Sequence, residues 1–248
     1  EGMPMVITVT TEKGGSGKST IAINIAFALK EKQPKAKILL IDCDPQGSIN
    51  TFDKIRKMDT NLPKIYDLVK DYKLYKENVS IEKAKEIYDY IIFDSGGRAT
   101  NEMRDTILVS DLAVIPTCPK SELDFDAFGR MMVFFEVTKK LAETIQDMEG
   151  INLDKNGKLK TKALAVMSMA TSNPLMVKTK TIPYRDNIRK IYTDNTNDII
   201  LANNIICERA AFANSISEGK GVIEYVNENH PAYKEIMELT NEILNYKE

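Results

Sequence analysis

The sequence contains few of the residues that build metal sites and disulfide frameworks. It has one histidine, His230, and three widely separated cysteines, Cys43, Cys118 and Cys207, among 248 residues. No Cys-x-x-Cys pair or Cys/His cluster occurs, which argues against a structural zinc site and against a disulfide framework. We therefore expect each cysteine to be a buried, reduced thiol.

Long hydrophobic segments are also missing. No apolar run approaches the roughly 20 residues that a membrane-spanning helix needs, and the first residues lack the order of a signal peptide. Hydrophobic residues make up 43% of the chain and charged residues 28%, which is typical of a globular protein in water. We expect a cytoplasmic protein with one domain over residues 1–248.

Short apolar runs alternate with helical patterns along the chain. The predicted strands are residues 5–10, 37–42, 90–94, 112–117, 162–169 and 199–206, and the main predicted helices are residues 19–32, 124–148 and 232–246. Unbroken apolar strands separated by helices are typical of a parallel sheet buried on both faces. The sequence therefore predicts a doubly wound, mostly parallel α/β fold with ligand chemistry at the carboxyl ends of the strands.

A glycine-rich loop, EKGGSGKST at residues 12–20, joins the first strand to the first helix. The usual phosphate-loop pattern G-x-x-x-x-G-K-[ST] has a glycine where this chain has Glu12, and Lys13 is an additional cation. The glycines let backbone N–H groups turn toward a phosphate, which Lys18 also reaches, while Ser19 is placed to ligate Mg²⁺. The predicted nucleotide-binding residues are Gly14, Gly15, Ser16, Gly17, Lys18, Ser19 and Thr20.

Aspartates at the ends of two further predicted strands complete the expected site. Asp94 ends the run YIIFD, which has the Walker B form of a carboxylate that holds the metal directly or through water. Asp42 and Asp44 flank Cys43 after the run ILLI. One of this pair is expected to support the magnesium shell, and the other to face the γ-phosphate or the attacking water.

The motifs KGGSGKST, LLIDCDPQGS, YIIFDSGG and DLAVIPTCPKSELD, in this order, resemble the ParA/MinD family of deviant Walker-A ATPases. More closely, they resemble the small ParA partition ATPases of plasmids, including the ParF-like branch. The likeness covers nearly the whole chain, because SISEGKGVIEY at residues 215–225 resembles the late Gly-Lys segment of the family.

The resemblance implies ATP and Mg²⁺ as cofactors and assigns roles by position. Lys13 matches the signature lysine, which in this family reaches across an ATP-sandwich homodimer to the phosphates of the partner. Lys18 matches the phosphate lysine, and Asp44 matches the switch aspartate needed for hydrolysis. The implied catalytic residues are Lys13, Lys18 and Asp44, and the implied metal-binding residues are Ser19, Asp42 and Asp94.

One segment departs from the family pattern. Many members have a proline pair after the Walker B aspartate, whereas this chain has Ser95-Gly96-Gly97-Arg98. Two interpretations of Arg98 stay open, one as a sensor of the γ-phosphate and the other as a surface residue.

Positive charge is concentrated in one part of the sequence. Nine basic residues and one acid, Asp186, lie between Lys155 and Lys190. Lysine and arginine contacts to phosphates supply nonspecific affinity for DNA, so we expect Arg185, Arg189 and Lys190 in a predicted helix to be DNA contacts. An ordinary solvated basic face is the alternative interpretation.

Two biological roles follow from the resemblance. In DNA segregation, an ATP-bound homodimer coats nucleoid DNA, and a small ParB-like centromere-binding adaptor stimulates hydrolysis and release. About four residues precede the first predicted strand, so we expect no N-terminal helix-turn-helix. A MinD-like membrane cycle would instead need a basic amphipathic tail, but the segment from His230 carries two lysines and four glutamates, so we expect it to pack on the sheet. The spacing of Cys43 and Cys118 does not resemble that of an iron–sulfur reductase of the wider family.

Overall fold

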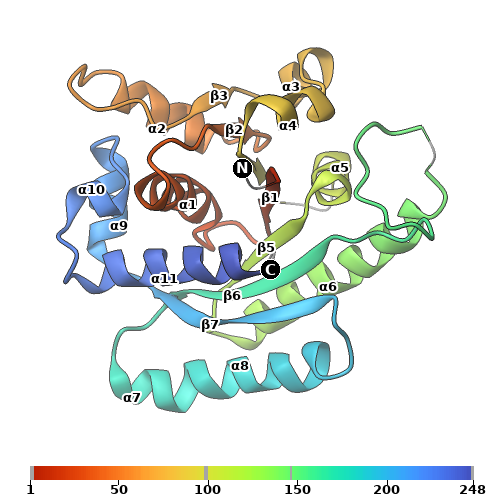
Figure 1. Ribbon diagram of the computed structural model, residues 1–248. Helices are drawn as coiled ribbons and strands as arrows, with labels where there is room; N and C mark the ends of the chain where they lie inside the picture. The colour runs from red at the N-terminus through yellow and green to blue at the C-terminus, as the bar shows by residue number, and fades with distance from the viewer. Residues whose placement is uncertain (1–2, 98–99, 146, 247–248) are drawn as a thin grey trace.

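The computed structural model describes residues 3–97, 100–145 and 147–246 and contains a seven-stranded sheet in the order β3-β2-β4-β1-β5-β6-β7 (Figure 1). Every pair of neighbouring strands in this sheet is parallel, which confirms the predicted fold class. The strands are β1 (Met5–Thr10), β2 (Ile38–Asp42), β3 (Asp67–Val69), β4 (Tyr90–Ser95), β5 (Leu112–Thr117), β6 (Lys162–Ala170) and β7 (Ile199–Cys207).

The six predicted strands are confirmed to within a residue at each end, but the edge strand β3 was missed. β3 has only three residues, all of them half-buried, and it pairs on one side with β2. A strand this short carries too few residues to show a periodic pattern. Its place at the sheet edge explains the partial burial.

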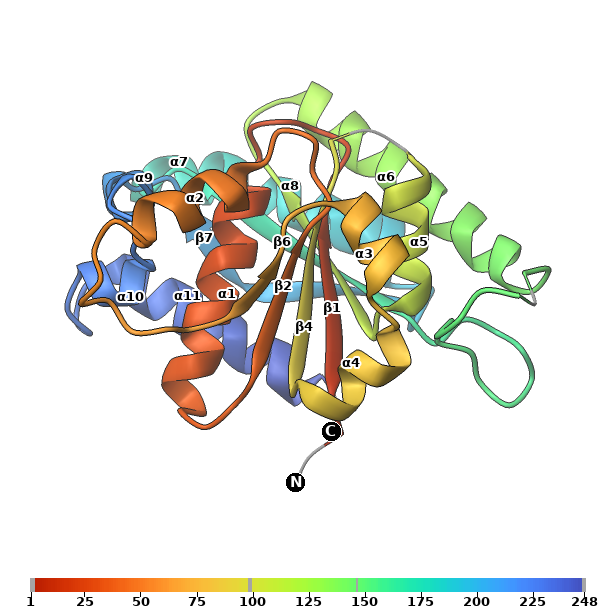
Figure 2. The same cartoon turned by 90° about the horizontal axis from the view of Figure 1, so that it is seen from above.

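Helices cover both faces of the sheet (Figures 1 and 2). In Figure 2 the loop after β1, the loop after β2 and the start of α6 gather at one end of the sheet. The helices are α1 (Lys18–Lys32), α2 (Ser48–Arg56), α3 (Tyr72–Asn78), α4 (Ile81–Ile87), α5 (Asn101–Val109), α6 (Glu122–Ala142), α7 (Pro174–Met176), α8 (Ile182–Ile188), α9 (Ala210–Ser217), α10 (Val222–Tyr225) and α11 (Pro231–Asn245), with π-helical segments η1 (Val177–Thr181) and η2 (Arg189–Thr193).

Successive side chains along each buried strand point to opposite faces of the sheet, so the core is divided between these two faces. Met5, Ile7 and Val9 of β1 pack in one cluster with α1 and α11, whereas Val6 packs on the other face with α3 and α4. A third cluster joins α5, α6 and α8 to β5 and β6 on that second face. Both faces of the central strands are therefore buried away from water, which explains why their sequences are unbroken apolar runs.

Helix α6 begins and ends earlier than the predicted range 124–148. Ser121 caps its start by accepting a hydrogen bond from the Asp124 backbone N–H, and the helix ends at Ala142. Ile145 and Met148 are partly buried against the core, although neither belongs to a helix. The predicted end was wrong because the spacing of apolar loop residues that pack against the core matches the pattern of a further helical turn.

The terminal helix and the cysteines behave as expected. Ile236, Leu239 and Ile243 of α11 are fully buried in the cluster shared with α1, which confirms that this segment packs on the sheet.

All three cysteines are buried and free. Across the described residues, no helix is both long enough and apolar enough to cross a membrane.

Segment 219–224 packs closely against α1 and α2. Gly219 has φ +68°, and a Cβ built there would lie 2.5 Å from the backbone nitrogen of Arg56. The buried Arg56 side chain donates to the Gly219 carbonyl at 2.9 Å and forms a salt bridge with Glu224. Glycine at position 219 is therefore required both by the backbone conformation and by the close approach of α2.

The substitution Gly219→Ala tests this close approach. Gly157→Ala is the matched control, because Gly157 has φ +75° but open space around a new Cβ. Overpacking costs about 1–3 kcal/mol, so Gly219→Ala should lower the free energy of unfolding by at least about 1 kcal/mol more than the control does. Urea unfolding of both variants measures the difference, and equal losses would contradict the close packing.

Candidate nucleotide-binding site

The glycine-rich loop forms a compact cradle at the amino end of α1. Gly15 and Gly17 have φ values of +75° and +79°, which L side chains rarely adopt, and Gly17 is the N-cap of the helix. Ser16 is 3% exposed, and its Oγ has no hydrogen-bond partner among the described residues. A helix amino end and a buried hydroxyl without a partner together provide donors for an anion, which fits a phosphate group.

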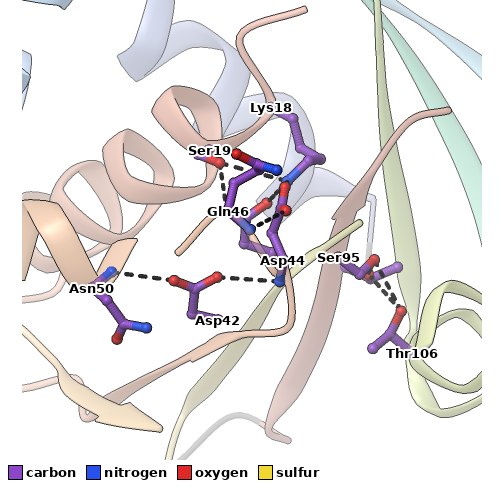
Figure 3. Close-up of polar contacts among 10 residues, drawn as sticks. Lys18, Ser19, Asp42, Asp44, Gln46, Asn50, Ser95 and Thr106 are labelled. Carbon is purple, nitrogen blue, oxygen red and sulfur yellow. Dashed lines mark hydrogen bonds and ion pairs between the residues drawn. The ribbon is translucent and has the colours of Figure 1, made fainter. Parts of the chain in front are cut away.

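The Lys18 ammonium lies between carboxylates from two neighbouring strands. It contacts Asp94 at the end of β4 and donates to Asp44 Oδ2, after β2, at 2.8 Å. The Ser19 hydroxyl donates to the other oxygen of Asp94 at 2.6 Å. Figure 3 shows Lys18 and Asp44 facing one another across this cluster. Four residues singled out in the sequence therefore meet within one group of hydrogen bonds.

Burial and charge act against each other in this cluster. Burial would lower the pKa of Lys18, but Asp94 and Asp44 outweigh it and raise that pKa. Burial raises the pKa of Asp94, and Lys18 and Ser19 only partly oppose it. Burial would also raise the pKa of the more accessible Asp44, but the Lys18 hydrogen bond lowers it. Lys18 thus stays charged and holds Asp44 ionised at neutral pH.

Asp42 occupies a different position from Asp44. Its two carboxylate oxygens accept hydrogen bonds from the backbone N–H groups of Asp44, at 3.2 Å, and Asn50, at 3.1 Å (Figure 3). Burial, and then the nearby Asp94, raise the pKa of Asp42 to about 6. In this conformation the side chain supports the loop after β2.

The cavity beside the loop has room for a nucleotide phosphate chain. Its volume is about 660 Å³, and it is lined by residues 13–20, by the loop after β2 and by the residues after β4. Ser19 and Asp94, two of the three predicted metal-binding residues, offer hard oxygen donors of the kind Mg²⁺ prefers, usually together with substrate phosphates. No group of three or more His, Cys, Asp or Glu side chains in the described ranges could hold a metal by itself. The donor set therefore fits a magnesium ion that arrives with phosphates. Arg98 lies outside the described residues.

Lys13 lies apart from the Lys18 cluster, although both belong to one loop. Its ammonium forms an ion pair with Asp124 in the first turn of α6, and the two side chains are 45% and 3% exposed. The Ser-x-x-Asp sequence at 121–124 is recognisable as a helix start, but Asp124 was not among the residues predicted for the site. The spacing of the two residues along the chain gives no sign of their contact.

The carboxyl end of β6 holds the phosphate loop from the side. The buried Ser168 hydroxyl donates to the Ser16 carbonyl at 2.6 Å. Met169 has φ +51° where the pairing of β6 with β7 is irregular, and its side chain lies 3.5 Å from a Cβ built on Gly17. Neither residue was predicted from the sequence, because an isolated Ser-Met pair in a strand gives no local signal.

The expected DNA-contact residues lie on the outer helix that runs from α7 to η2. Arg189 and Lys190 are exposed, and Arg189 lies 3.4 Å from Asp186. Arg185 is half-buried and donates to the Asn203 carbonyl at 3.3 Å. The other basic residues of the charged segment divide between this helix, which carries Lys178 and Lys180, and the start of β6 with the loop before it, which carry Lys155, Lys158, Lys160 and Lys162.

Comparison with known proteins identifies the family. Residues 7–231 match the model of the CobQ/CobB/MinD/ParA nucleotide binding domain. The chain belongs to this family. It is thus a member of the ParA/MinD family of nucleotide-binding ATPases, in agreement with the phosphate loop and the Lys18 cluster.

Relatives differ in how much of the chain they match. The Rhizobium radiobacter "Protein ParA" is 29% identical over 123 residues, which cover 48% of this chain and 50% of the relative. The alignment thus spans about half of that relative. The Halothiobacillus neapolitanus "Maintenance of carboxysome distribution protein A" is 23% identical over 245 residues, covering 96% of this chain and 95% of the relative.

Two similar solved structures are complexes with a nucleotide. A plasmid partition protein from Borrelia burgdorferi bound to AMPPNP has a TM-score of 0.60 and 22% identity, with 99% of this chain and all of that chain covered. A complex of a Cyanothece McdA variant with ATP has a TM-score of 0.70 and 17% identity, with 99% of this chain and 98% of that chain covered. At these identities the likeness establishes a shared fold.

The variant Lys18→Ala tests the phosphate site. A hydrogen bond to a charged group contributes about 1.5–3 kcal/mol, so ATP affinity should fall by at least about tenfold. Lys120→Ala is the control, because Lys120 is an exposed lysine paired with Glu208 outside the phosphate loop. Calorimetric titration with ATP measures both affinities, and unchanged ATP binding by Lys18→Ala would contradict the assignment.

Proposed function

We propose that this protein is an ATP-dependent DNA-segregation ATPase, closest to the small, ParF-like partition ATPases. In this proposal an ATP-sandwich homodimer binds DNA nonspecifically. A small ParB-like centromere-binding adaptor stimulates hydrolysis, which releases the DNA. The observation that carries the proposal is the combination of a two-lysine phosphate loop with an exposed basic face on the outer helix.

The Lys18 cluster supports Mg²⁺-dependent hydrolysis of ATP. Ser19 and Asp94 would hold the metal, with Asp42 near its shell, and bound Mg²⁺ would neutralise charge on the β- and γ-phosphates. Asp44 is the more exposed carboxylate of the cluster. Its oxygens can accept a hydrogen bond from a water molecule, which suits a group that positions the attacking water. Lys18 moves from the carboxylates to the phosphates when ATP enters, because the phosphates bring negative charge to the same ammonium.

Lys13 supports a role for a homodimer. Its side chain is nearly half exposed, lines the cavity and lies outside the group of residues around Lys18. A cation at the developing charge of the γ-phosphate stabilises the transition state of phosphoryl transfer. In this proposal Lys13 reaches such a phosphate from outside the subunit that binds it, as the family resemblance implies.

Positioning roles other than DNA segregation are the alternative. MinD from Aquifex aeolicus shares the fold, with a TM-score of 0.65 and 21% identity over 97% of each chain. However, the apolar residues of α11 are buried in the core, so this helix has no apolar face available to a membrane. The exposed basic residues of the outer helix fit a polyanion such as DNA better.

The variant Asp44→Ala should separate ATP binding from hydrolysis. Because Lys18 and the phosphate cradle stay in place, the variant should bind ATP, fail to release phosphate and accumulate as a dimer. Asp59→Ala, which removes an exposed acid beyond α2, is the control. Phosphate release and light scattering with ATP measure the two effects, and hydrolysis at the wild-type rate would rule out the assigned role.

DNA binding should require ATP and depend on the outer helix. Each phosphate contact contributes about 0.9 to the slope of log affinity against log salt, so Arg189→Ala/Lys190→Ala should weaken binding and reduce that slope by up to about two. Lys155→Ala/Lys158→Ala removes the same charge from a separate exposed loop and serves as the control. Fluorescence anisotropy with a random-sequence duplex measures both. Equal losses in the two double variants, or binding without ATP, would count against the proposal.

A further inference from the structure

The first two turns of α6 lie between the phosphate loop and the outer helix (Figure 1). On the loop side, Asp124 forms the ion pair with Lys13, and Arg130 lies 3.0 Å from Glu12. The second pair is well exposed and contributes little, because salt screens surface charges. The Lys13–Asp124 pair differs, because its carboxylate is buried.

Among the residues that the structure describes, the Asp124 carboxylate is bound by two side chains. One oxygen pairs with Lys13, and the other accepts the Ser121 hydroxyl at 2.6 Å. If Lys13 left, the buried carboxylate would keep only the Ser121 contact, and an unpaired buried charge is strongly unfavourable. Loss of Lys13 to a phosphate would therefore favour a rearrangement of the first turn of α6.

On its other side, the same part of α6 supports the outer helix through aromatic rings. Phe125 meets Tyr184 edge-on, with ring centroids 5.5 Å apart, and Phe128 meets Tyr192 at 5.4 Å. A Cβ built on Gly129 would lie 2.8 Å from the Tyr192 hydroxyl, so the two helices are in close contact there. Tyr184 and Tyr192 belong to the outer helix that carries Arg189 and Lys190.

We propose that the first turn of α6 couples nucleotide binding to DNA binding. In this proposal Asp124 holds the Lys13 ammonium until a phosphate takes the place of the Asp124 carboxylate. The displaced turn shifts Phe125 against Tyr184, and the position of the outer helix and its basic residues changes with it. Packed side chains with two arrangements are a physical route for such coupling. This inference rests on the proposed function, since it requires nucleotide-dependent DNA binding.

Chemical labelling tests the ion pair directly. In Asp124→Asn the charge is lost, while an acceptor for Ser121 remains. Removing the ion pair should make Lys13 react up to about fivefold faster with an acetylating reagent in the absence of nucleotide. Exposed Lys155 serves as the internal standard in mass spectrometry, and Asp126→Asn, an exposed acid two residues along α6, is the matched control. An unchanged rate at Lys13 in Asp124→Asn would overturn the holding role of Asp124.

The coupling itself is the ratio of DNA affinities with and without AMPPNP. Allosteric coupling of ordinary size predicts a ratio of about 5–150 for the wild-type protein. Asp124→Asn should reduce this ratio by at least about threefold, because Lys13 is no longer held in the resting state. Phe125→Leu should reduce it as much without changing the labelling of Lys13, since it alters only the contact with the outer helix.

The outcomes separate the two proposals. A wild-type ratio well above one that both variants retain would overturn the coupling and leave the proposed function intact. A reduced ratio in both variants, with a normal ratio in Asp126→Asn, supports the coupling. A wild-type protein that binds no DNA with AMPPNP would refute the proposed function and the coupling together.

Discussion

The site depends on one buried ammonium group, that of Lys18, and on the carboxylates that surround it. A lysine that is 8% exposed needs paired charges, and Asp94 and Asp44 supply them. They do so only because β2 and β4 are parallel neighbours whose carboxyl ends meet beside the loop that follows β1. The sheet order, the sharp loop at Gly15 and Gly17 and the start of α1 are all needed to bring these charges together.

The two lysines of the loop show how burial separates chemically equal residues. Lys18 lies inside the cluster, where it neutralises the carboxylates of Asp44 and Asp94. Lys13, five residues earlier, is 45% exposed and is held by an acid from α6. The two cations are thus controlled by different elements, one by the sheet and the other by a helix that also supports the outer basic face. In the coupling that we propose, this division lets one short loop serve both nucleotide binding and communication with the outer helix.

Much of the fold could be predicted because its signals are local. The runs MVITVT, YIIFDS and LAVIPT are strands buried on both faces, and their apolar residues show this directly. β3 was missed because three half-buried residues carry no pattern. The range predicted for α6 was too long because Ile145 and Met148 return to the core from a loop. In both cases packing decided what the local pattern could not.

The sequence by itself determined the phosphate loop, the strand-end aspartates and the parallel α/β fold, because each depends on residues close together in the chain. Only the tertiary structure decided which acid holds Lys13, since Asp124 is 111 positions away and an aspartate in the first turn of a helix gives no sign of its distant partner. It also divided the basic segment between a loop, a strand and the outer helix, and directed Asp42 toward the backbone instead of Lys18. These outcomes depend on how whole elements pack, and spacing along the chain does not encode that packing.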